Sequence, residues 1–113
     1  MAGLDSLRAY GANVDEGLNR CVNNEEFYLK MIRKAVEDPG FENLQQAIAG
    51  KDLATAFEIA HALKGVLANL ALTPLSEPVS EIVELLRSRT DTDYSGYLEK
   101  IAAKKDELVQ LLQ

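Results

Sequence analysis

The chain has 113 residues, 47% of them hydrophobic and 27% charged, a balance typical of a globular protein that can bury a core without disulfides or metals. Its formal charge of −6 argues against binding to nucleic acid or to an anionic membrane, because both need a basic surface. No apolar run approaches the roughly 20 residues of a membrane span, and the N-terminus lacks the pattern of a signal peptide, so we expect a single cytoplasmic domain over residues 1–113.

The first 20 residues are predicted to form one or two short helices. These are expected to break near Gly11 and again at Gly17, with Asn13 or Asp15 available as an N-cap. Cys21 follows as the only cysteine, so it cannot form an internal disulfide and is expected to be a buried or half-buried small hydrophobic residue. Because the chain also has only one histidine, no cluster shows the spacing of a zinc or iron site.

Two amphipathic helices are predicted next. The first is capped by the pair Asn23–Asn24 and stopped at Asp38-Pro39-Gly40, and the second ends at Gly50. Their apolar residues, all expected in the core, recur at intervals of three and four: Phe27, Tyr28, Met31, Ile32, Ala35 and Val36, then Phe41, Leu44, Ala47 and Ile48.

Three further helices complete the prediction. Asp52 is placed to cap a helix that runs to about Leu72, and Thr73-Pro74 are the cap and first-turn proline of the next, in which Pro78 should cause a kink or a displaced start. The apolar stripe of that helix is Leu75, Val79, Ile82, Val83 and Leu86. After a polar break over residues 88–93 the last helix, weakened at Gly96, has its apolar series at Tyr94, Tyr97, Leu98, Ile101, Leu108, Leu111 and Leu112.

No segment alternates with the period of a strand. The sequence therefore predicts an all-α fold, an up-and-down four-helix bundle with short additional N-terminal helices.

The helix over residues 52–72 carries His61, the only histidine. At about 100° per residue, the side opposite His61 is predicted to face the core, and it comprises Ala56, Ile59, Leu63, Val66, Leu67 and Leu70. The residues that share the side of His61 are Phe57, Lys64, Gly65, Ala68 and Leu72. A lone histidine in an apolar helix is more often a core or interface residue, but this helical phase places the imidazole in solvent.

Gly65 is the second informative residue of this helix. A glycine inside a helix costs roughly 0.5–1 kcal/mol relative to alanine, so a compensating role is expected. One turn beyond His61, a glycine leaves room for another surface to reach the imidazole. Lys64 can direct its ammonium group toward an anion carried on the imidazole.

These residues carry a resemblance to a known family. The segment AFEIAHALKGVLANLALTPL, with its His61-Ala62-Leu63-Lys64-Gly65 core, resembles the signature of histidine-containing phosphotransfer (HPt) domains, and the similarity extends from about Asp15 to Arg87. The resemblance implies a four-helix bundle in a two-component phosphorelay. Its exposed histidine accepts a phosphoryl group from a receiver-domain aspartyl phosphate and passes it to another receiver aspartate.

The resemblance also implies roles for the site residues and their partners. His61 would be phosphorylated, Lys64 would stabilise the phosphoryl charge, and Gly65 would give the partner access. A docking patch would comprise Phe57, Ala68, Asn69, Leu72 and Arg87, although Asn69 could be merely solvated and Arg87 could simply pair with Glu84. The partners would be response-regulator receiver domains and a hybrid sensor histidine kinase; the chain is expected to be a monomer without a cofactor of its own, the divalent metal lying in the receiver. With no ATP-binding motif, it is expected to be a phosphoryl carrier rather than a kinase.

Two positions depart from the pattern of the family. Ala71 stands where many members have glycine, and Val83 stands where some have a glutamine that hydrogen-bonds the histidine ring. How the tautomer of His61 is fixed is therefore left open.

Two alternatives are weighed against this interpretation. One is an enzyme that uses His61 as a general base oriented by Glu58, which would need a pocket. The other is a helical adaptor that docks receiver or kinase domains without carrying phosphate. An adaptor has no reason to combine a reactive imidazole, a lysine and a costly glycine, so the set His61, Lys64 and Gly65 favours the carrier.

Overall fold

The computed structural model describes residues 3–113, which form seven α-helices and no strand. The helices are α1 (Leu4–Tyr10), α2 (Val14–Arg20), α3 (Glu25–Val36), α4 (Gly40–Ala49), α5 (Leu53–Asn69), α6 (Thr73–Arg87) and α7 (Ser95–Leu111). None of these helices is long and apolar enough to cross a membrane. The all-α prediction is confirmed.

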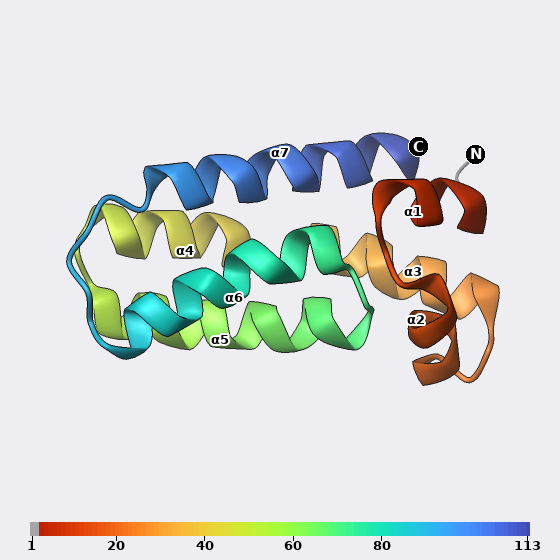
Figure 1. The fold of residues 1–113 in the computed structure, drawn as a ribbon, viewed down its shortest axis with the longest axis horizontal. Helices are drawn as coiled ribbons and strands as arrows, with labels where there is room; N and C mark the ends of the chain where they lie inside the picture. Colours follow the sequence, from red (N-terminus) through yellow and green to blue (C-terminus); the bar gives the residue numbers. More distant parts are fainter. Residues whose placement is uncertain (1–2) are drawn as a thin grey trace.

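Helices α4 to α7 form the up-and-down bundle (Figure 1). Helix α5 packs against both α4 and α6, and α6 also packs against α7. The α4–α5 and α6–α7 connections lie together at one end, where Lys51 Nζ is 3.9 Å from Asp91 Oδ1. The short helices α1 and α2 and the start of α3 lie at the opposite end, near the turn between α5 and α6. The predicted bundle with additional N-terminal helices is therefore confirmed.

Most helix boundaries follow local signals that the sequence displays. The side chains of Asn13, Asn24 and Asp52 each accept a hydrogen bond from the backbone N–H three residues further on, so they cap α2, α3 and α5. Gly11 ends α1 in the left-handed conformation with φ +114°, and Gly50 is the C-cap of α4. These caps fix where α5 begins, and thus the register that places His61.

Gly17 does not break a helix, contrary to the prediction, but lies inside α2. A Cβ atom at Gly17 would lie 2.5 Å from Cζ of Tyr28, so glycine is needed there to admit the buried tyrosine ring. The Tyr28 hydroxyl donates a hydrogen bond of 2.9 Å to the carbonyl oxygen of Leu70, and burial raises the pKa of Tyr28 to about 12. This pair thus ties α2 and α3 to the end of α5.

Helix α5 ends at Asn69, three residues before the predicted end. Ala71 adopts φ +57°, a left-handed conformation that favours glycine, and reverses the chain. Leu72 consequently becomes the N-cap of α6 and is fully buried, so its prediction as a solvent-facing docking residue is wrong. Thr73 is the first residue of α6 rather than its cap, and Pro78 does not displace the start of this helix.

The core contains most of the predicted apolar residues, including Cys21, which is a buried free thiol. Two predicted core residues are instead exposed, Phe27 by 44% and Val66 by 40%. In α3 the inward positions are taken by Tyr28, Ile32 and Ala35, and Phe27 lies beside that row. In α5 the inward positions are Ala56, Ala60, Leu63 and Leu67. Because α5 faces the gap between α4 and α6, its buried side is rotated from the direction directly opposite His61, which leaves Val66 outside.

Candidate functional site

His61 lies in the middle of α5 on the exposed side of that helix, as predicted. Its exposed neighbours on α5 are small or neutral apart from Glu58, and they comprise Ala62, Gly65, Val66, Ala68 and Asn69. The imidazole is therefore open to solvent. Because the exposed side chains around it are small, a partner could approach this face of α5 closely.

The Phe57 ring stacks on the imidazole of His61, with the ring centroids 5.6 Å apart and the planes 16° from parallel. Phe57 precedes His61 by one helical turn and is half-buried between α5 and the end of α6. Val83, at the position of the family's glutamine, is fully buried and has no hydrogen-bonding group to offer. Stacking on Phe57 is thus the contact by which this chain restricts the orientation of the ring.

Two guanidinium groups lie over the same phenylalanine. Cζ of Arg87 and Cζ of Arg89 are each 5.3 Å from the ring centroid of Phe57. Arg87 Nε also donates a hydrogen bond of 3.3 Å to Glu84 Oε2, so the simple ion pair that the sequence left open is present as well. Both guanidinium groups therefore contact the ring that stacks on the imidazole of His61.

Sequence reasoning missed Arg89. It placed this residue only in the polar break after α6, because helical periodicity says nothing about a residue beyond the helix end. The spacing of Arg87 and Arg89, one on each side of Ser88 at the end of an apolar stripe, is the signal that could have drawn attention to it.

Lys64 and Gly65 follow His61 on α5. Lys64 is half-buried, and no carboxylate pairs with its ammonium group in the part of the chain that the structure describes. A Cβ added to Gly65 would meet no atom within 4 Å. Packing within residues 3–113 therefore does not require a glycine there, and its cost in helix stability is unexplained by the fold.

The other predicted docking residues divide into two groups. Ala68 and Asn69 are exposed on the side of His61, and the carbonyl oxygen of Ala68 accepts a hydrogen bond of 2.6 Å from Arg20 of α2. Leu72, as described above, lies in the core instead. The exposed Val66 adds an apolar side chain that the sequence had placed inside.

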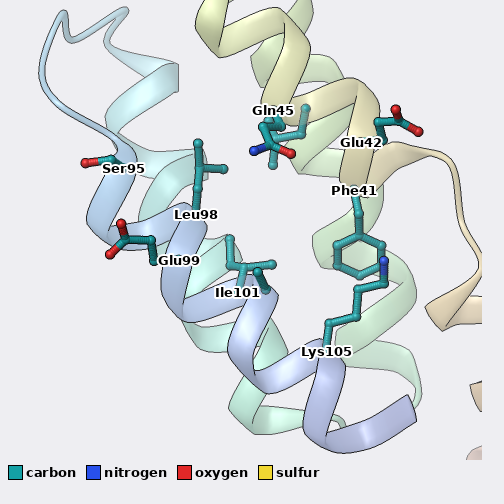
Figure 2. Close-up of a pocket in the computed structure, with 10 residues that line it drawn as sticks. Phe41, Glu42, Gln45, Ser95, Leu98, Glu99, Ile101 and Lys105 are labelled. Atoms are coloured by element: carbon teal, nitrogen blue, oxygen red, sulfur yellow. The ribbon is translucent and has the colours of Figure 1, made fainter. Parts of the chain in front are cut away.

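A groove lies between α4 and α7 (Figure 2). It has a volume of about 390 Å³ and is lined by Phe41, Glu42, Leu44, Gln45, Ser95, Leu98, Glu99, Ile101, Ala102 and Lys105. Nζ of Lys105 lies 5.0 Å from the ring centroid of Phe41, so the ammonium group makes a cation–π contact inside the groove. The lining contains no histidine or cysteine and no residue of α5 or α6, so the groove is separate from the site.

The structure offers little for an enzyme that uses His61 as a base. No hydrogen bond joins Glu58 to His61 in the described residues, and neither residue lines the groove. Across residues 3–113, no group of three or more His, Cys, Asp or Glu side chains could hold a metal ion. What the site provides is an exposed nucleophilic nitrogen, nearby cations and an accessible helix face.

Comparison with known protein families identifies the fold and family of most of the chain. The family model described as the Hpt domain matches residues 29–113, a range that includes α4 to α7 and every residue of the site described above. No curated protein and no solved structure gave a significant match.

Proposed function

The chain belongs to the Hpt domain family, and from this premise we propose that His61 takes a phosphoryl group from the aspartyl phosphate of one receiver domain and passes it to the aspartate of another. Hpt domains carry phosphoryl groups in phosphorelays, are not kinases and interact with receiver domains. The specific donor, acceptor and site residues are the part that we propose. A hybrid sensor histidine kinase is the upstream partner that we propose for this role.

The chemistry asks little of the chain beyond an exposed imidazole. A neutral ring nitrogen presents its lone pair to phosphorus; the N–P bond forms as the P–O bond to the receiver aspartate breaks, and the receiver regains a free carboxylate. Transfer to the next receiver reverses these changes. The divalent metal that balances charge in this step is expected on the receiver.

The observation that carries the proposal is the surroundings of His61. Within residues 3–113, an exposed imidazole is followed by a lysine without a carboxylate partner and by a glycine at which a Cβ would meet no atom within 4 Å. A partner that approaches α5 closely, bearing an anionic phosphoryl group, accounts for all three residues.

A relay with two receivers tests this proposal. The chain is incubated with a receiver labelled on its aspartate, separated from it, and then mixed with a second, unlabelled receiver. Label should move first to the chain and then to the second receiver. A chain that folds and binds both receivers but never takes the label would instead be an adaptor.

Replacing Lys64 with alanine is expected to slow phosphotransfer by roughly tenfold without unfolding the chain, because one cation near the phosphoryl group is lost. The rate is measured by rapid mixing with a phosphorylated receiver. Lys100→Ala, at an exposed lysine of α7, is the matched control and should transfer at the wild-type rate. Equal rates for the two variants would remove Lys64 from the mechanism.

Gly65→Ala is expected to separate stability from function. The added methyl group meets no described atom within 4 Å, so the helix should gain roughly 0.5–1 kcal/mol, measured by urea unfolding. The same methyl group stands where the partner must approach, so transfer should slow. Gly96→Ala in α7, where a Cβ also meets nothing within 4 Å, should give a similar gain with unchanged transfer. A Gly65→Ala variant that transfers at full rate would show that partner access does not need this glycine.

A further inference from the structure

Arg89 occupies an unusual place for a surface arginine. It lies just beyond the last residue of α6 with φ +53°, a left-handed conformation that is uncommon outside glycine. Its Nη1 donates a hydrogen bond of 2.6 Å to the carbonyl oxygen of Leu86, and its Cζ is 5.3 Å from the ring centroid of Phe57. The turn therefore directs the guanidinium back toward α5.

The charge of Arg89 is less compensated than that of its neighbour. Arg87 is paired with the carboxylate of Glu84. Over residues 3–113 Arg89 has no carboxylate partner, and its polar contact is a neutral carbonyl oxygen. Its delocalised cation is thus available to a nearby anion.

Phe57 connects this cation to His61. The ring that lies under the guanidinium of Arg89 is the ring that stacks on the imidazole. Charged residues near these groups along the chain include Glu58 and Lys64 on α5, Glu84 and Arg87 on α6, and Asp91, which pairs with Lys51 at 3.9 Å. Arg89 and His61 therefore contact the same aromatic ring, and a group attached to the imidazole is carried next to that ring.

We propose that Arg89 is a further phosphoryl-binding residue, stored over Phe57 until His61 is phosphorylated and then paired with the phosphoryl oxygens. The inference rests on the proposed function of His61. A phosphoryl group brings close to two negative charges and three acceptor oxygens, and a guanidinium binds such a group through two parallel hydrogen bonds. In this proposal the guanidinium leaves the Phe57 ring by turning about the side-chain torsions of Arg89, and it starts from a contact with the ring that stacks on His61.

Titration of the phosphoryl group tests the pairing directly. His61 of the full chain is phosphorylated with phosphoramidate, a small-molecule phosphoryl donor, and the ³¹P NMR signal is followed against pH. A paired cation favours the dianion, so Arg89→Gln is expected to raise the proton affinity of the phosphoryl group about threefold. Arg89→Lys, which keeps the charge, should restore most of the wild-type value. Arg33→Gln, at an exposed arginine of α3, is the control and should leave it unchanged.

The outcomes separate the two proposals. A signal on phosphorylated His61 with the same titration in wild type and Arg89→Gln would overturn the role of Arg89 alone. Absence of any phosphoryl signal on His61 in wild type would overturn the proposed function, and the inference with it. Should Arg89→Gln not fold, the Arg89 side-chain ¹⁵N signal of the wild type decides, since it should shift on phosphorylation and an unshifted signal contradicts the pairing.

Discussion

His61→Gln is expected to abolish phosphorylation of the chain completely while leaving its helical fold intact. The side-chain amide of glutamine lacks the nucleophilic ring nitrogen that attacks phosphorus. The chain has no second histidine that could replace it. The imidazole is exposed, and its contact is the stacking on Phe57, so the loss in the free energy of unfolding should not exceed about 1 kcal/mol. Labelling from a phosphorylated receiver and circular dichroism measure the two effects.

The control for this prediction lies in the same protein preparation. Wild type and His61→Gln are labelled in parallel, with helicity and thermal unfolding compared before the reaction. Acid-labile phosphate remaining on a folded His61→Gln chain would place the acceptor elsewhere.

Gly17→Ala is expected to be among the most destabilising of the single-methyl changes in this chain. The new Cβ would lie 2.5 Å from both Cζ and the hydroxyl oxygen of Tyr28. That ring cannot yield cheaply, because it is fully buried and its hydroxyl is bonded to Leu70. Overpacking of this kind lowers the free energy of unfolding by about 1–3 kcal/mol. Because the tyrosine ring is held rigidly, we expect a loss of about 3 kcal/mol, which lowers the melting temperature by roughly 10 °C.

Gly96→Ala is the matched comparison, since a methyl group there meets open space and should raise stability slightly. Thermal unfolding of the two variants gives the contrast. If Gly17→Ala has the melting temperature of the wild type, then Gly17 does not pack closely against the Tyr28 ring. In that case this contact does not anchor the N-terminal helices to the end of α5.

The sequence predicts this fold well where structure depends on neighbours along the chain. Caps at Asn24 and Asp52, the stop near Pro39 and the apolar stripe of α6 are all local signals, and all appear in the structure as predicted. Gly17 was misread because a glycine required by contact with a distant ring looks the same in sequence as one that breaks a helix.

The site was predicted less completely for a related reason. The exposure of His61 follows from helical phase, but the end of α5 depends on the left-handed Ala71, which residue preferences do not favour; this moved Leu72 from the predicted docking patch into the core. Val66 was placed inside because the true buried direction of α5 depends on where α4 and α6 pack. Arg89 reaches the site across the α5–α6 interface, a contact that no periodicity within one helix can show.

Locating the phosphoryl group on the wild-type chain is the decisive measurement for the role of His61. After reaction with a phosphorylated receiver, the chain is checked for phosphate that is labile in acid and stable in base, and is then digested under alkaline conditions for mass spectrometry. We expect a single phosphoryl group, on the peptide that contains His61. Phosphate on any other peptide, or phosphate that survives acid, would contradict it.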